Sequence, residues 1–278
     1  MNQEYKFFIV CTDRHSYKII KKNGGNKILI SYFYLRKSKS MKEILASDNE
    51  TEFLIDSGLF SYYSGANGTD RNYENLMKYF DEYINFVKEN CNRENIKGFF
   101  ELDFDLCGLD YHTQVKSLQK RLLDITNKII LICQKGRTME DIEEMCKQNV
   151  ETIAIPFASN IERKWFDYHL IIDLAHKNNK RVHLLGCATS KYCKYAEQSD
   201  SSTWIKEGAY GREFKIFDND LKCFHWTATK HLKDDDEMKI NKDDYKLRTE
   251  NNCRAFIQFD KLINEMKKIK EDKQQRLF

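Results

Sequence analysis

The sequence has a single proline, Pro156, and little net charge for a chain of 278 residues. Its 46 Lys and Arg residues nearly balance 43 Asp and Glu residues, so the net charge is +3. This balance argues against a protein that binds DNA through overall charge alone, although it allows a local basic groove. The 13% of aromatic residues exclude disordered and collagen-like classes. A chain of this length buries enough apolar surface to fold without disulfides.

The sequence also lacks a CxxC pair and an apolar run near the ~20 residues of a membrane span. Its nine cysteines are an odd number, and Cys133 lies within the apolar run Ile129–Cys133, where a free thiol packs as a small hydrophobe. The first residues show no signal-peptide pattern. We therefore expect a cytoplasmic protein without a membrane partner. The Asn-, Lys- and Ile-rich composition fits an AT-rich genome such as that of a phage, in which case the location is the host cytoplasm.

Short apolar runs alternate with amphipathic stretches along the chain. The runs are rich in Ile, Val and Phe, which is typical of strands covered on both faces of a parallel sheet. They are Phe7–Cys11, Ile28–Leu35, Phe53–Ile55, Phe99–Leu102, Ile129–Cys133, Thr152–Phe157 and Val182–Leu185. From Phe53 on, their starts are 46, 30, 23 and 30 residues apart, which is typical of βα units. The pattern predicts an α/β fold, a (β/α)8 TIM-like barrel, with a doubly wound open sheet as the alternative.

Four stretches between the runs show helical periodicity. They are Tyr73–Lys88, Val115–Ile125, Met139–Lys147 and Trp165–His176. Thr138 and Asp141 have the spacing of a capping box that starts the third of these helices. A last strand is expected at Phe214–Phe217, where the βα pattern weakens.

The two ends of the chain carry additional elements. Lys22–Lys27 contains two glycines and predicts the turn of an N-terminal hairpin. Residues 232–248 are dense in charge and predict a solvated loop. An amphipathic C-terminal helix is expected at Asn251–Lys268, followed by a charged flexible tail over 268–278. We expect a single domain over 1–278.

Polar residues collect where the apolar runs stop. Asp56 and Ser57 follow the third run, Asp103 follows the fourth, Gln134 the fifth and Gly186 the seventh. A barrel carries its chemistry at the carboxyl ends of its strands, so these residues are candidates for one pocket. The alternative is that Asp and Gly stand there for turn chemistry alone.

Three segments in order resemble motifs of the tRNA-guanine transglycosylase superfamily. They are Asp56–Ser61 (DSGLFS), the Gln134–Gly136 segment (QKG), and Gly186 followed by Asp200. The chain is most similar to the shorter phage and bacterial DNA-guanine transglycosylases, which insert 7-deazaguanines into DNA. The resemblance spans roughly residues 50 to 212, and the ordered set is more specific than any one motif.

The resemblance implies a role for each matching residue. Asp200 would be the nucleophile that attacks C1′, and Asp56 the general acid and base. Asp103 would accept from N1–H and N2–H₂ of guanine, and Gln134 would donate to O6. Ser57 and Gly186 would complete the substrate site. Two displacements at one carbon need a carboxylate nucleophile, which agrees with this assignment.

Cations flank the expected nucleophile. Lys191, Lys194 and Arg212 lie on either side of Asp200 in the sequence and are candidates for contacts to a nucleic-acid backbone. The alternative is an ordinary mixed-charge surface.

The chain departs from the family at two points. Ile155-Pro156-Phe157 replaces a Gly-Gly-Leu segment that contacts the incoming base. The zinc motif of the tRNA enzymes is missing, and its nearest remnant is formed by Cys223, His225, His231 and Cys253. Four nitrogen and sulfur ligands could come from these residues, but scattered His and Cys are more often packing residues, so we expect no metal and no cofactor.

The expected function is exchange of guanine in DNA for a 7-deazaguanine base, such as preQ0 or a relative. Its partners would be DNA and a free 7-deazaguanine base. The same exchange on tRNA, as in queuosine-type modification, is the first alternative, disfavoured by the missing zinc motif and short C-terminal region. A nucleic-acid N-glycosidase and a non-catalytic nucleic-acid-binding barrel are the others. The sequence leaves the oligomeric state open.

Overall fold

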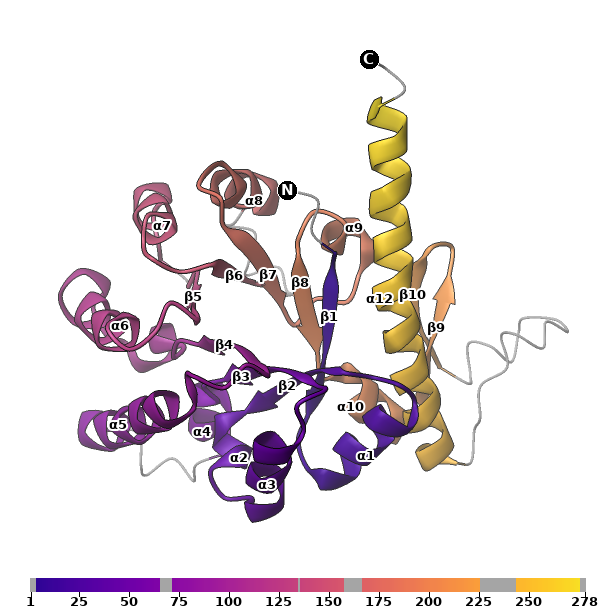
Figure 1. Ribbon diagram of the computed structural model, residues 1–278, viewed down its shortest axis with the longest axis horizontal. Coiled ribbons are helices and arrows are strands. Elements are labelled where there is room, and N and C mark those ends of the chain that lie inside the picture. The colour runs from indigo at the N-terminus through magenta and orange to yellow at the C-terminus, as the bar shows by residue number, and fades with distance from the viewer. Residues whose placement is uncertain (1–3, 66–71, 135, 158–166, 226–243, 276–278) are drawn as a thin grey trace, which may run out of the picture. The chain divides into compact units, whose positions relative to one another are not determined.

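The computed structural model describes residues 4–65, 72–134, 136–157, 167–225 and 244–275. Eight strands close into a parallel barrel in the order β1 to β8, which confirms the predicted α/β barrel (Figure 1). The strands are β1 (Lys6–Cys11), β2 (Lys27–Ser31), β3 (Glu52–Asp56), β4 (Ile96–Phe100), β5 (Ile129–Ile132), β6 (Thr152–Pro156), β7 (Arg181–Leu185) and β8 (Gln198–Ser201).

Contacts within the chain divide it into two compact units. Unit 1 comprises residues 1–27 and 184–278, and unit 2 comprises residues 28–183. In unit 1, β1 pairs in parallel with β8, so that Phe8 lies opposite Asp200. In unit 2, β3, β4, β5 and β6 pair in parallel in sequence order.

Most barrel strands form where the apolar runs predict them, because both of their faces are covered. All four residues of β5 and the three central residues of β3 are buried. The eighth strand is different, because Gln198-Ser199-Asp200-Ser201 has no apolar side chain and is nevertheless buried throughout. A strand of this composition gives no hydrophobic signal in the sequence.

Helices follow the strands, and Figure 1 shows α5, α6 and α7 on the outer side of the strands of unit 2. Unit 2 contains α2 (Tyr32–Leu35), α3 (Lys39–Ser47), α4 (Leu59–Gly65), α5 (Tyr73–Asn90), the 3₁₀-helix η1 (Phe104–Cys107), the π-helix η2 (Tyr111–Val115), α6 (Lys116–Leu123), α7 (Met139–Cys146) and α8 (Tyr168–Lys177). The predicted capping box is present at the start of α7, where Thr138 and Asp141 bond reciprocally.

Unit 1 adds helices and a separate small sheet. They are α1 (Arg14–Lys22), α9 (Ser190–Cys193), α10 (Thr203–Ala209), α12 (Tyr245–Gln275), and the antiparallel pair β9 (Arg212–Phe217) and β10 (Asp220–His225). The strand expected at Phe214–Phe217 exists, but it lies in this pair and not in the barrel.

The predicted N-terminal hairpin is wrong. Asp13 accepts from the backbone N–H of Ser16 at 2.8 Å and starts α1, so a helix and not a second hairpin strand follows β1 in the chain. The turn after Lys22 ends that helix and leads into a strand, with the N–H of Gly25 bonded to the carbonyl of Ile20. A glycine turn of this kind ends a helix as readily as it joins two strands.

The C-terminal helix is longer than predicted. It begins at Tyr245, inside the stretch expected as a charged loop, and it continues to Gln275, inside the stretch expected as a tail. Residues 226–243, which make up most of the expected loop, lie outside the described residues. The apolar side of α12 packs on other elements of unit 1. The ring of Phe256 lies 5.4 Å from that of Phe7 and 4.9 Å from that of Phe214, measured between ring centres.

Candidate active site

Asp200 and Gly186 meet in unit 1. Asp200 lies near the carboxyl end of β8 and is only 6% exposed. Its Oδ1 accepts a hydrogen bond of 3.1 Å from the backbone N–H of Gly186, which follows β7. The φ of Gly186 is 68°, a left-handed conformation that glycine adopts without strain. Two residues that the resemblance assigns to one site are therefore in contact.

A buried network supports β8 beside Asp200. The hydroxyl of Tyr5 is hydrogen-bonded to the hydroxyl of Ser199, and the thiol of Cys193 lies 3.5 Å from the same Ser199 oxygen. Asn264 of α12 bonds both the N–H and the carbonyl of Tyr5, at 2.7 and 3.0 Å. Sequence reasoning missed Tyr5 and Ser199, because a Tyr before an apolar run and a Ser among polar residues carry no distinctive signal.

Asp56 ends β3 in unit 2, as expected. Its Oδ2 accepts from the backbone N–H of Gly58 at 3.0 Å, and the residue is partly exposed. Burial and then the negative charge of Asp56 raise the pKa of both Tyr79 and Tyr83 well above the usual value. These phenols therefore stay protonated, and that of Tyr79 donates to the carbonyl of Ser57 at 2.6 Å.

Ser57 itself is fully buried. Its hydroxyl oxygen has no hydrogen-bond partner within the described part of the chain. A buried hydroxyl without a partner is destabilising by itself, and the role expected for Ser57 at the substrate stays a prediction.

Gln134 and Asp103 follow neighbouring strands of unit 2. Gln134 is 1% exposed, and its amide nitrogen donates to the carbonyl of Leu102 at 2.8 Å. Asp103 follows Leu102, starts η1 and is partly exposed. Gln134 thus holds the segment that ends in Asp103, and the direct contact to guanine O6 expected for it stays a prediction.

Glu101 is a buried carboxyl group that the sequence analysis did not single out. Its two oxygens accept from the N–H of Ile132 at 2.6 Å and from the amide of Gln119 at 2.7 Å. Burial raises its pKa to about 7, against which these bonds and the charge of Arg137 act only in part. A single Glu within the apolar run Phe99–Leu102 is the signal that could have identified it.

The three cations expected at the nucleic-acid backbone all belong to unit 1. Lys191 is exposed on α9, and its Nζ lies 5.1 Å from the ring centre of Tyr192. Lys194 lies 5.2 Å from the ring centre of Tyr195. Arg212 begins β9 and bonds Glu207 at 2.8 Å, so its charge is partly neutralised. The two lysines are therefore better placed than Arg212 to bind an anion.

Three of the four residues of the zinc remnant lie in the described part of the chain. Cys223 and His225 lie on β10, Cys253 is fully buried in α12, and His231 lies outside the described residues. Burial raises the pKa of Cys223 to about 11 and that of Cys253 to about 12, which favours thiols over thiolates. The described residues contain no group of three or more His, Cys, Asp or Glu that could hold a metal ion.

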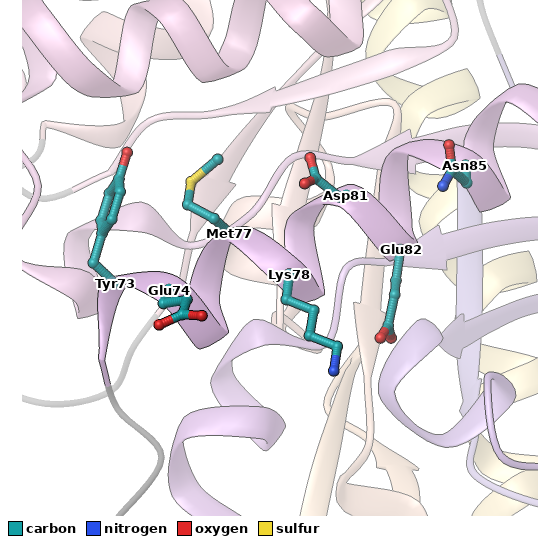
Figure 2. A pocket seen from close by; sticks show the side chains of 7 residues that line it. All are labelled: Tyr73, Glu74, Met77, Lys78, Asp81, Glu82 and Asn85. Atoms are coloured by element: carbon teal, nitrogen blue, oxygen red, sulfur yellow. The ribbon is translucent and has the colours of Figure 1, made fainter.

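Hollows in the described part of unit 2 include two that are lined mainly by helix residues. One, of about 570 Å³, lies along a single face of α5, and Figure 2 shows its lining side chains rising from that helix alone. They are Tyr73, Glu74, Met77, Lys78, Asp81, Glu82 and Asn85. The other, of about 420 Å³, lies between α5 and the segment that contains α2 and α3. Neither is lined by a predicted site residue.

Comparison with family models finds no match to this sequence, and comparison with curated proteins finds none either. Solved structures with similar folds include a Coccidioides immitis protein assigned as a fructose-1,6-biphosphate aldolase. It is 9% identical, with a TM-score of 0.50, over 94% of this chain and 88% of the aldolase. Another is a mutant tryptophan synthase α-subunit from Pyrococcus furiosus, 9% identical with a TM-score of 0.47, over 95% of this chain and 98% of that one. At such identities the likeness concerns the fold alone.

Within the described residues, none of the helices has both the length and the apolar character needed to cross a membrane.

Proposed function

We propose that this chain is a guanine transglycosylase that exchanges guanine in DNA for a 7-deazaguanine base such as preQ0. The observation that carries the proposal is the hydrogen bond between Gly186 and Asp200. The family resemblance assigned these two residues to one site from sequence order alone, and their contact in unit 1 supports that assignment. The buried, oriented carboxylate is what nucleophilic attack on C1′ requires.

The proposed reaction consists of two displacements at C1′ of the target nucleotide. In the first, a carboxylate oxygen of Asp200 forms a bond to C1′ while the bond from C1′ to N9 of guanine breaks. Asp56 donates a proton to the leaving base. In the second, Asp56 takes the N9 proton of the incoming base, whose nitrogen attacks C1′ and releases Asp200. Configuration at C1′ is retained, and no electrons are gained or lost.

The chain contributes positioning at both carboxylates. The N–H of Gly186 fixes one oxygen of Asp200, and the N–H of Gly58 does the same for Asp56. Both bonds come from backbone groups, which have little freedom to move and so hold the carboxylates in a defined orientation. Asp103 would accept from the N1–H and N2–H₂ edge of guanine. The base would leave the stack to reach these groups.

The nucleic-acid backbone would be held beside Asp200 by Lys191 and Lys194. Because the net charge is only +3, affinity would come from these local cations. Binding should then be modest and should weaken as salt rises.

The experiment is base exchange with labelled preQ0. The protein is incubated with guanine-containing DNA or with tRNA, and the nucleosides are analysed for label. We expect label in DNA, and we expect Asp200→Asn to abolish it. Asp218→Asn is the matched control, because Asp218 lies in the β9–β10 turn and should leave exchange unchanged.

Other outcomes would overturn the proposal in distinct ways. Label in tRNA alone would move the activity to tRNA. Release of guanine without incorporation would indicate an N-glycosidase. Binding of nucleic acid with neither reaction would indicate a non-catalytic barrel.

A further inference from the structure

The guanidinium group of Arg137 lacks some of its hydrogen-bond partners within the described residues. Arg137 follows β5 by way of Gly136, and its Cζ stacks 3.5 Å from the ring centre of Tyr111. Its Nε and Nη2 are covered by protein atoms, yet neither has a hydrogen-bond partner in the part of the chain that the structure describes. Because Arg stays charged at any physiological pH, these two N–H groups are a source of instability until an acceptor reaches them.

The carboxylates around Tyr111 do not supply that acceptor. Three of them act on the Tyr111 hydroxyl together with Arg137: Asp141, Glu101 and Glu144. Each has other partners. Asp141 accepts from the N–H and hydroxyl of Thr138, at 3.0 and 3.1 Å. Glu101 accepts from Ile132 and Gln119, and Glu144 pairs with Lys116 at 2.5 Å.

A second stacked arginine of unit 2 shows what Arg137 lacks. Arg36 lies 4.8 Å from the ring centre of Tyr79, and among the described residues its Nε also has no partner. However, its Nη1 bonds the carboxylate of Glu82 at 2.9 Å, so the charge of Arg36 is paired within the protein. The stacking is common to both residues, but two nitrogens of Arg137 have no acceptor among the residues that the structure describes.

The backbone beside Arg137 is open. Gly136 is exposed and has a φ of 85°, and no atom of the described residues lies within 4 Å of the place where its Cβ would stand. Arg137 as a whole residue is only partly buried. A rotation of the Arg137 side chain away from the covering atoms would present the guanidinium to an anion from solvent, without unfolding of β5.

We propose that Arg137, stacked on Tyr111, binds a phosphate group. Nε–H and one Nη2–H lie on the same edge of the guanidinium and match two oxygens of a phosphate, the geometry that makes Arg a strong phosphate ligand. Tyr111 supports the flat face of the guanidinium. The assignment to a phosphodiester of the nucleic acid rests on the proposed function, whereas binding of phosphate itself does not.

The first test uses inorganic phosphate and no nucleic acid. Thermal unfolding is followed as phosphate is added, with sodium chloride at equal ionic strength as the reference. We expect phosphate to raise the Tm of the wild type by roughly 2–4 °C in a saturable manner. Arg137→Met keeps the length of the side chain over Tyr111 but removes the charge, so its Tm should not respond. Arg36→Met should respond like the wild type.

Two further measurements distinguish a phosphate site from a purely structural role of Arg137. Without phosphate, Arg137→Met should be at least as stable as the wild type, because it removes an unpaired charge, whereas a structural role predicts a lower Tm. Arg137→Lys keeps the charge but not the fork and should respond only weakly. A wild type that does not respond, or an Arg137→Met that responds fully, would overturn the phosphate site.

The nucleic-acid step has its own measurement. If Arg137 contacts a phosphodiester, the slope of log K against log salt for DNA binding should lose about one unit in Arg137→Met. Saturable phosphate binding with an unchanged slope would overturn the assignment to nucleic acid and keep the phosphate site. Base exchange is not used in either test, so failure of the transglycosylase proposal would be recognised separately.

Discussion

The carboxyl group of Glu101 accepts a 2.6 Å hydrogen bond from the backbone N–H of Ile132, which lies at the end of the neighbouring strand. The second oxygen accepts from Gln119 of α6 at 2.7 Å. One buried acid therefore ties β5 and a covering helix to the segment that leads to Asp103. This arrangement gives the fold a titratable group two residues before Asp103, which is a candidate site residue.

Stability should therefore fall as pH rises from about 4.5 to about 7. Burial raises the pKa of Glu101 to about 7 from an ordinary 4.5, so the folded state holds this proton more tightly than the unfolded state. The contribution is fully present below pH 4.5 and is lost as pH rises through about 7. Between these values the wild type should lose up to about 3 kcal/mol from this group.

The check is Glu101→Gln, which keeps an acceptor for Ile132 and removes the charge. Urea unfolding at several pH values should show the wild-type free energy falling relative to that of the variant. The exposed Glu94→Gln is the control and should follow the wild type. Parallel wild-type and Glu101→Gln curves would contradict the prediction.

The link between Tyr5 and Ser199 should matter for activity as well as stability. Tyr5→Phe removes the hydroxyl that bonds Ser199, the residue before Asp200. We expect a loss of about 1 kcal/mol in the free energy of unfolding. We also expect a lower kcat for base exchange with little change in KM, because the nucleophile loses orientation and the substrate loses no contact. Tyr210→Phe, at an exposed tyrosine, should change neither quantity.

The C-terminal helix α12 should contribute to the free energy of unfolding through the hydrogen bonds of Asn264. Its side chain satisfies both backbone groups of Tyr5, at 2.7 and 3.0 Å. Asn264→Ala leaves those groups without partners, so we expect a loss of about 1–3 kcal/mol in urea unfolding. Glu265→Ala on the exposed side of the same helix is the control. Equal stability of the two variants would show that α12 does not hold β1 in this way.

The barrel could be predicted because most of its strands are apolar and covered on both faces. Ile129–Ile132 is an example, since four consecutive buried residues leave few alternatives to a central strand. The helix over Tyr245–Gln275 was only partly predicted, because its first turns are polar and its packing depends on Phe7 and Phe214, which are distant in sequence.

The eighth strand could not be predicted from hydrophobicity. Gln198–Ser201 is buried although it is polar, because Tyr5 and Gly186 satisfy its side chains at Ser199 and Asp200. Such pairings become visible only when the chain is folded. Asp200 was found through the resemblance, and Glu101 was missed because one charged residue in an apolar run has no periodicity of its own.

The last prediction concerns Gly186, whose N–H orients Asp200. Gly186→Ala puts a Cβ on a residue with a φ of 68°, which should destabilise the fold by about 1 kcal/mol. Relaxation of this strain should also move the N–H away from Asp200 and lower the rate of base exchange by about tenfold. Gly211→Ala is the matched control, because Gly211 has a φ of 75° in the same unit and open space around it. The two variants should lose similar stability, and only Gly186→Ala should lose activity; an equal loss of activity in both would show that general strain, and not the orientation of Asp200, is responsible.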